Sequence, residues 1–147
     1  MPGILVGVDG SDHSRHALAW AMREAAKHHV PLTVMTVHPD PVRPATGIYW
    51  GVRLAPEDGL NLELARASVQ QFVEKVADEI GETVPDITVT AVTGDPAAEL
   101  IRAASGADLL VVGSRGSGEF ARLLMGSVSS KVVHHAAGPV AVIRGKG

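Results

Sequence analysis

The sequence predicts a single α/β domain built on one five-stranded, parallel, doubly wound sheet with helices on both faces. Five short apolar runs rich in β-branched residues recur along the chain, and segments with helical spacing of apolar residues separate them. Of the 147 residues, 46% are hydrophobic and only 3% are aromatic, so the core must consist of aliphatic side chains. Such a core suits parallel strands covered by helices. At this length the chain can bury one substantial core, and we interpret residues 1–147 as one domain.

The strands alternate with helical segments throughout. Strict alternation with right-handed crossovers predicts one parallel sheet. The third strand alternates polar and apolar residues, which favours an edge position. The predicted strands cover residues 4–8, 32–37, 87–92, 109–113 and 140–143.

Four helices are predicted between the strands. The third opens at Asp95-Pro96, because proline is tolerated in a first turn. The fourth begins near Gly126-Ser127 and ends before Gly138-Pro139. The first two place their apolar residues on one face: Leu18, Ala21, Met22 and Ala25 in the first, and Ala65, Val69, Phe72, Val73, Val76 and Ile80 in the second.

The segment from His38 to Pro56 contains four prolines and has no periodic pattern. We therefore predict a long loop, a type of segment that is often a lid or disordered. Its Tyr49 and Trp50 would cover a ligand or a partner, or they are incidental aromatics of a surface loop. The residues leave both readings open.

Charge and composition exclude several function classes. A formal net charge of -3, with basic residues scattered singly, gives no attraction to nucleic acid, so a small-molecule partner is expected. The chain has no cysteine, no basic leader and no apolar run long enough to span a membrane. We expect a cytoplasmic protein without disulfides or a membrane anchor. The adjacent histidines at 28–29 and 134–135 point in different directions on a helix, so no dedicated metal site is expected.

The candidate site lies where the predicted strands end, because ligands of open α/β sheets bind beyond the carboxyl ends of the strands. Glycines in Gly113-Ser-Arg-Gly116 let backbone amides approach an anion. Gly126-Ser127 would add the unpaired amides and positive dipole end of the fourth helix. Together these two segments would clamp a polyphosphate, although glycines after a strand also serve tight turns for purely conformational reasons.

The spacing of these residues, G-x2-G-x9-G-S, resembles that of the universal stress protein family. The likeness extends over nearly the whole chain, including the segments 4–11, 94–97, 107–116, 124–129 and 138–140. It implies a Rossmann-like fold of the adenine nucleotide alpha hydrolase-like type and membership of the ATP-binding branch of the family.

The resemblance also implies a set of ligand contacts. Triphosphate contacts would lie at Gly113, Gly116, Gly126 and Ser127, with Ser129 further into the helix. Asp9 would bind the ribose, although an aspartate before Gly-Ser also suits a strand-to-helix turn. Val37 would lie at the adenine edge, with core packing as its competing use. Arg115 is open between pairing with a phosphate and exposure to solvent.

Three functions remain possible on these residues. The first is a stress-response protein that binds ATP, ADP or AMP, with magnesium or manganese arriving on the nucleotide, and acts as a nucleotide-dependent binding or signalling module. The second is a slow metal-dependent ATPase or nucleotidyl-transfer enzyme, although no catalytic base can be assembled from the candidate residues. The third is an interaction scaffold with a vestigial site. A homodimer through the terminal strand, Val140 to Ile143, is implied by the family and by the exposed edge of that strand.

Overall fold

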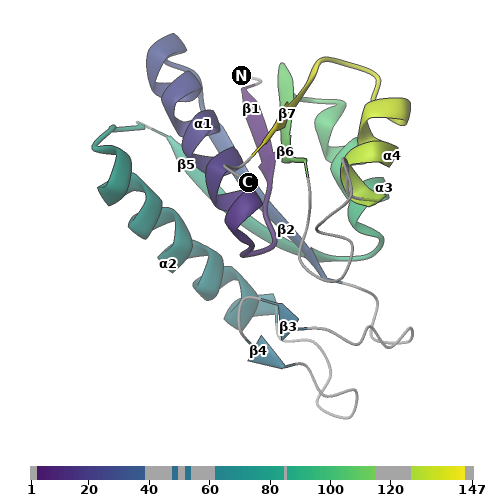
Figure 1. Ribbon diagram of the computed structural model, residues 1–147, viewed down its shortest axis with the longest axis horizontal. Helices are drawn as coiled ribbons and strands as arrows, with labels where there is room; N and C mark the ends of the chain where they lie inside the picture. Colours follow the sequence, from purple (N-terminus) through teal and green to yellow (C-terminus); the bar gives the residue numbers. More distant parts are fainter. Residues whose placement is uncertain are drawn as a thin grey trace.

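The computed structural model describes residues 3–38, 48–49, 52–53, 62–84, 86–114 and 127–144. Its main sheet has five parallel strands in the order β5-β2-β1-β6-β7. This confirms the predicted fold class, and the strand predicted for an edge is indeed at one (Figure 1). The strands are β1 (Ile4–Gly7), β2 (Leu32–His38), β5 (Ile87–Thr93), β6 (Leu109–Gly113) and β7 (Val140–Ile143).

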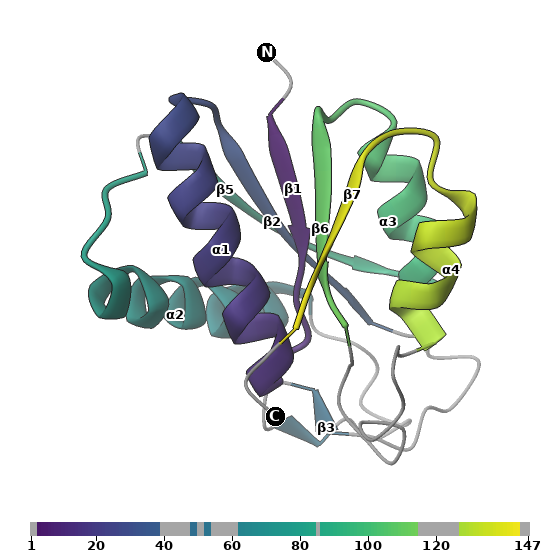
Figure 2. The same ribbon diagram turned by 45° about the horizontal axis from the view of Figure 1, so that its top comes forward.

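Four helices cover the two faces of this sheet (Figure 2). Helices α1 and α2 contact each other and pack on one face, and α3 and α4 contact each other on the opposite face. Their bounds agree closely with the apolar spacing in the sequence: α1 (Asp12–His28), α2 (Leu62–Ile80), α3 (Pro96–Ala104) and α4 (Ser127–His135).

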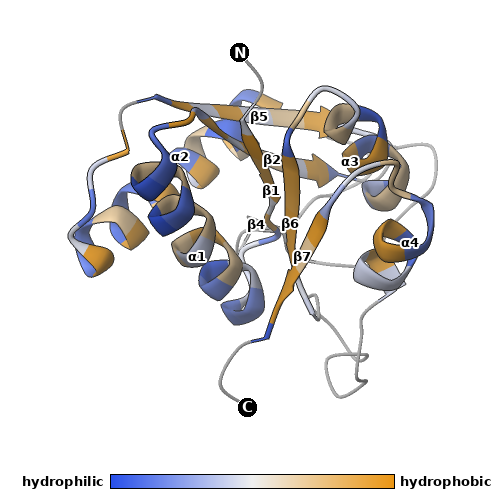
Figure 3. Cartoon of the chain, turned by 90° about the horizontal axis from the view of Figure 1, so that it is seen from above, coloured by the Kyte–Doolittle hydropathy of each residue, from blue (hydrophilic) through white to orange (hydrophobic). Residues whose placement is uncertain are grey.

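The alternation of side chains along the strands divides the core into two layers. Val6 and Val34 belong to the layer under α1 and α2, and their neighbours Leu5 and Met35 belong to the layer under α3 and α4. Figure 3 shows apolar residues concentrated on the strands, with polar residues on the outer faces of the helices. The largest fully buried side chains include Leu18, and burial of each such side chain stabilises the fold by about 1.5–3 kcal/mol.

Capping residues set the helix starts that face the candidate site. Ser11 caps α1, its hydroxyl accepting from the backbone N–H of Ser14 at 3.2 Å. Asp95 caps α3 by accepting from the N–H of Ala98 at 3.0 Å, and Pro96 follows in the first turn as predicted. Both helices therefore begin directly beyond the carboxyl end of the preceding strand.

The prediction of a structureless loop over residues 38–56 was wrong in part. The segment contains a short antiparallel hairpin of β3 (Ile48–Tyr49) and β4 (Val52–Arg53), and β2 extends through His38. Two strands of two residues each are too short to produce a detectable alternation among the prolines. The hairpin lies on the carboxyl-end side of the main sheet (Figures 1 and 2). Trp50 and the remaining residues of the loop lie outside the described residues.

Candidate functional site at the carboxyl edge of the sheet

The strand order creates a switch point between β1 and β6. The chain leaves β1 through α1 toward β2, and it leaves β6 toward α4 and β7 on the other side. Because α1 and α4 cover opposite faces, the connections after β1 and β6 diverge at the carboxyl edge. This is the position at which open α/β sheets bind ligands. Three of the predicted site residues lie at this edge. Asp9 follows β1, Gly113 ends β6 and Ser127 begins α4.

The turn after β1 holds Asp9 at this edge. The carboxylate Oδ1 accepts a hydrogen bond from the N–H of Ser11 at 2.9 Å, which stabilises the turn. Gly10 has a φ of 82°, a left-handed conformation that favours glycine. Asp9 is half-buried. Asp9 therefore stabilises the turn, which is one of the two roles considered for it. The hydrogen bond to Ser11 holds its carboxylate near the start of α1.

Gly113 lies in a close contact between β6 and α1. A Cβ at this position would lie 3.0 Å from the carbonyl oxygen of His13, in the first turn of α1. The next amide, that of Ser114, donates to the carbonyl of Ile143 at 2.8 Å. Thus the end of β6 approaches the backbone of α1 closely on one side and pairs with β7 on the other. The sequence interpretation, which considered only an anion or a tight turn, missed this contact.

The start of α4 is tied to the end of β6 by a buried hydrogen bond. The hydroxyl of Ser129 donates to the carbonyl oxygen of Ser114 at 3.0 Å, and both residues are buried. Ser127, two residues earlier, is exposed at the first position of α4. The helix start, with its positive dipole end, is thereby held at the end of β6. Ser129 acts here as a positioning residue.

Replacing Ser129 by alanine is expected to lower the free energy of unfolding by about 1–2 kcal/mol. The change leaves the buried carbonyl of Ser114 without this donor, and an unsatisfied buried acceptor is costly. Urea unfolding monitored by circular dichroism measures the difference. Ser130→Ala, one residue along the same helix, is the matched control and should change stability much less. Equal effects of the two variants would contradict the assigned role of Ser129.

Val37 serves the core through its side chain. It is 6% exposed and packs in the layer that contains Met35, Leu100 and Val132. Core packing, the competing use considered for this residue, is therefore what the side chain does. On one side, the backbone of Val37 pairs with Val92 of β5. On the other side, the last hydrogen bond between the β1 and β2 segments runs from the N–H of Val8 to the carbonyl of Met35. The backbone of Val37 therefore lies beyond the point where these two strands are paired.

Two histidines at the same edge were not selected from the sequence. His38 ends β2 and is 2% exposed, and its carbonyl accepts from the N–H of Gly94 at 2.8 Å. His13 lies against Gly113, and its Nδ1 is buried with no hydrogen-bond partner among the described residues. A histidine directly after a long apolar run was the available signal for His38. No comparable pattern marks His13.

Acidification is expected to destabilise the fold through His38. Burial lowers the pKa of its imidazole, because desolvation disfavours the charged form. Between the usual value for an unfolded chain, about 6.5, and the lowered folded value, the unfolded state therefore binds more protons. The stability present above about pH 6.5 is lost as the pH falls, by at most about 1.4 kcal/mol per pH unit.

Urea unfolding from about pH 7.5 to about pH 5.5 tests this dependence. His38→Gln should flatten the profile, and His134→Gln, at an exposed position of α4, should leave it unchanged. A profile that keeps its slope in His38→Gln would assign the effect to another group.

Three of the predicted contacts, Arg115, Gly116 and Gly126, lie outside the described residues. Among the described residues, no three side chains of histidine, aspartate or glutamate gather closely enough to hold a metal ion. None of the helices in these ranges is both long and apolar enough to cross a bilayer. The described part of the site therefore consists of the carboxylate of Asp9, the backbone of Val37, the end of β6 and the start of α4.

This fold defines a doubly wound α/β protein, and its candidate ligand site lies at the switch point of the sheet. A sequence profile of the universal stress protein family matches residues 2–144. The chain belongs to the universal stress protein family. The predicted resemblance to this family is therefore confirmed.

Relatives of known name agree with this assignment. A universal stress protein of Mycolicibacterium smegmatis is 40% identical over 145 residues, which cover 97% of this chain and 48% of the relative. A Mycobacterium tuberculosis universal stress protein, Rv1996, is 36% identical over 96% of this chain and 47% of its own length. This chain thus spans about half the length of these curated relatives.

Solved structures show the same fold. Universal stress protein UspA from Lactobacillus plantarum has a TM-score of 0.70 and 27% identity, with 97% of both chains covered. A universal stress protein solved in complex with cAMP has a TM-score of 0.66 and 26% identity, covering 97% of this chain and 96% of its own.

Proposed function

We propose that this protein binds an adenine nucleotide, with ATP as the preferred ligand, at the carboxyl edge of its sheet. The observation that carries the proposal is the placement of an exposed start of α4, at Ser127, beside the end of β6. Unpaired helix amides and the helix dipole favour a phosphate there. The family member crystallised with cAMP supports an adenine nucleotide as the ligand class.

We assign a separate set of residues to the ribose, the adenine and the phosphates of the nucleotide. Asp9 accepts hydrogen bonds from the ribose hydroxyls, and the backbone of Val37 reads the adenine edge. Ser127 contacts the phosphates together with backbone groups of the Gly113–Gly116 and Gly126 segments, and Arg115 adds its charge. Ser129 supports these contacts indirectly, through Ser114. Magnesium or manganese would bind through phosphate and water oxygens.

Nucleotide occupancy is proposed to act as a signal in a stress response. A bound polyphosphate would favour one arrangement of the segments around it, and partners would then recognise that arrangement. The candidate residues include groups that would hold an anion, but no catalytic base for an attacking water can be assembled from them. Binding and signalling therefore fit the site better than ATP hydrolysis. We place the protein in the cytoplasm, in keeping with a sequence that contains no cysteine.

Mass spectrometry of ligand retained after gentle purification tests the proposal directly. Adenine nucleotide is the expected finding, and calorimetric titration should rank ATP, ADP, AMP and cAMP. Gly116→Ala is a better test of the phosphate segment than a change at Gly113, because Gly113 also packs against α1. A protein that neither retains nor binds any of the four would be a scaffold with a vestigial site. Metal-dependent loss of ATP in a single-turnover assay would instead show an enzyme.

A homodimer through β7 is the second part of the proposal. This strand lies at a sheet edge, and all four of its residues are half-buried. The carbonyls of Pro139 and Ile143 accept hydrogen bonds from the β6 side. Because the direction of backbone groups alternates along a strand, the N–H and C=O of Val142 point to the open edge. A second copy can pair with those groups across a two-fold axis.

Replacing Val142 by proline is expected to convert the dimer to a monomer. The substitution removes an outward N–H without removing a bond to β6, and proline is tolerated on edge strands. Val142→Thr keeps the N–H and should remain dimeric. Sedimentation equilibrium at micromolar concentration distinguishes the two. Unchanged association of Val142→Pro, or a monomeric parent protein, would argue against pairing through β7.

A further inference from the structure

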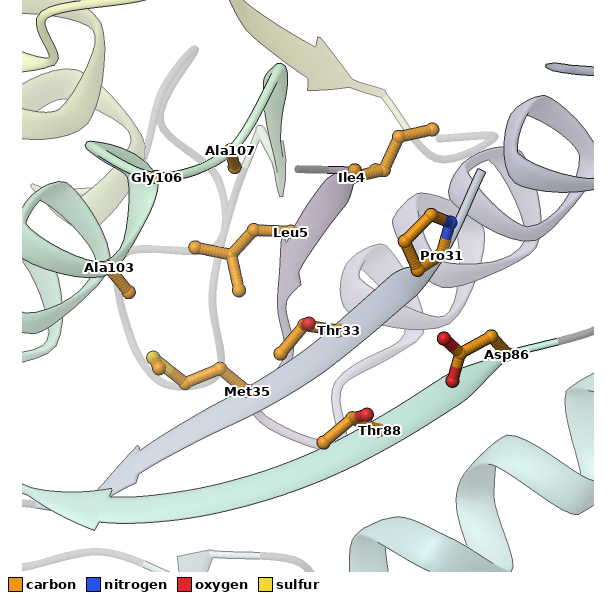
Figure 4. Close-up of a pocket in the computed structure, with 11 residues that line it drawn as sticks. Ile4, Leu5, Pro31, Thr33, Met35, Asp86, Thr88, Ala103, Gly106 and Ala107 are labelled. Atoms are coloured by element: carbon orange, nitrogen blue, oxygen red, sulfur yellow. The ribbon is translucent and has the colours of Figure 1, made fainter. Parts of the chain in front are cut away.

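A cleft lies at the opposite end of the sheet from the proposed nucleotide site. Its volume is about 510 Å³, within the range of small-molecule sites. Gly3, Pro31 and Asp86 line it, and each directly precedes a strand, β1, β2 or β5 respectively. The cleft is therefore at the amino ends of these strands, between the end of α3 and the sheet (Figure 4).

One wall of the cleft is apolar. Leu5 and Met35 extend from β1 and β2 into it, facing Ala103 and Ala107 at the end of α3 and just beyond it (Figure 4). Leu5 and Met35 are 3% and 8% exposed, so their positions are set by the core layer to which they belong. This wall suits a short aliphatic body, because burial of apolar surface is favourable and needs no specific partner.

The same face of the sheet also carries oxygen atoms, on the side toward β5 (Figure 4). Thr33 and Thr88 are directly paired in the β2–β5 register, so their side chains stand on the same face of the sheet. Asp86 adds an exposed carboxylate at the start of β5 (Figure 4). Among the described residues that line the cleft, none is a lysine, an arginine or a histidine. The formal charge that these residues contribute is therefore negative.

The end of α3 reinforces this negative field. The carboxyl end of a helix carries the negative end of the helix dipole, and Ala103 and Gly106 place that end at the cleft. The nearest basic residue of this helix, Arg102, is 74% exposed at its side chain and paired with Glu99 at 3.1 Å. Its charge is therefore directed to a carboxylate outside the cleft lining.

We propose that this cleft binds a small organic ammonium ion with an aliphatic body. The carboxylate of Asp86 and the hydroxyls of Thr33 and Thr88 would receive the ammonium group, whose donors need acceptors. Leu5 and Met35 would cover the hydrocarbon chain. An anion is disfavoured by both Asp86 and the α3 dipole. This site is separate from the proposed nucleotide site and does not depend on it.

Pentylammonium is a suitable probe because it combines one ammonium group with a five-carbon chain. Titration into ¹⁵N-labelled protein should shift the amide signals of Thr33, Thr88, Gly106 and Ala107 in a saturable manner. A dissociation constant on the order of 1 mM is expected for so small a ligand. Pentanoate and pentanol, which replace the cation by an anion or a neutral group, should produce weaker shifts. Salt at about 0.5 M should weaken pentylammonium binding by screening.

The matched variants are Asp86→Asn and Glu82→Gln. Each removes one exposed carboxylate near the start of β5, but only Asp86 lines the cleft. Asp86→Asn should weaken pentylammonium binding about threefold to fivefold, and Glu82→Gln should leave it unchanged. The same spectra report whether each variant is folded. Equal binding of all three probes, equal effects of the two variants, or shifts confined to the carboxyl edge would each overturn the proposal.

Discussion

Replacing Asp9 by asparagine is expected to weaken ATP binding about 10-fold to 100-fold. In the proposed complex, this carboxylate accepts hydrogen bonds from the ribose hydroxyls. Bonds to a charged acceptor contribute about 1.5–3 kcal/mol, which corresponds to the expected loss. Asparagine keeps an oxygen that can accept from the N–H of Ser11, so the turn after β1 should be preserved.

Asp12→Asn is the matched control for this experiment. Asp12 is exposed in the first turn of α1, where its carboxylate pairs with Arg15 at 2.9 Å. Its hydrogen bond with Arg15 lowers the pKa of this carboxyl, and the control therefore also removes an ionised group close to the site. Calorimetric titration should show little change in ATP affinity for Asp12→Asn. Similar losses in the two variants would indicate a general charge effect and not a ribose contact.

A modified nucleotide makes the test of Asp9 more specific. ATP that lacks the ribose 2′-hydroxyl already lacks one of the proposed partners of the carboxylate. Asp9→Asn should therefore cost less affinity with this analogue than with ATP, which is the coupling that a direct contact requires. The same loss for both nucleotides would place the ribose away from Asp9.

Replacing Gly113 by valine is expected to reduce the free energy of unfolding by about 2–3 kcal/mol. The added Cβ alone would lie 3.0 Å from the backbone oxygen of His13, and a backbone atom in a helix cannot move aside as a flexible side chain can. The two further methyl carbons enlarge the required displacement of α1 from β6. For a chain of this size, the midpoint of thermal unfolding should fall by about 5–10 °C.

Gly138→Val provides the control, since a Cβ at Gly138 meets nothing within 4 Å. Differential scanning calorimetry of the two variants measures their midpoints under identical conditions. A stability loss restricted to Gly113→Val would establish the contact between β6 and α1. Equal midpoints for Gly113→Val and the parent protein would show that α1 can shift freely, contrary to the proposed packing constraint.

The elements of the fold were predictable because each has a strong local pattern. The α3 start followed from Asp95-Pro96, and the edge position of β5 followed from its alternating residues. The helical spacing of apolar residues over several turns of α1 and α2 likewise indicated helices that bury one face. The β3–β4 hairpin was missed because pairs of two residues carry almost no periodic signal.

The candidate site was predictable to a lesser extent. The glycine spacing placed the candidate site after the fourth predicted strand, and the structure puts Gly113 at the carboxyl edge of the sheet. It could not show that Gly113 packs against His13 or that the Ser129 hydroxyl donates to Ser114, because these partners are distant along the chain. Burial of His38 likewise depends on elements that pack around it.

The sequence by itself determined the order of strands and helices, the family and the positions of the glycines and serines at the switch point. Those features follow from periodicity, caps and spacing, which are properties of neighbouring residues. Only the tertiary structure decided which partners Gly113 and Ser129 contact, and where the cleft around Thr33, Thr88 and Asp86 forms. Close approach and enclosure arise when distant segments pack together, and no local pattern encodes the resulting distances.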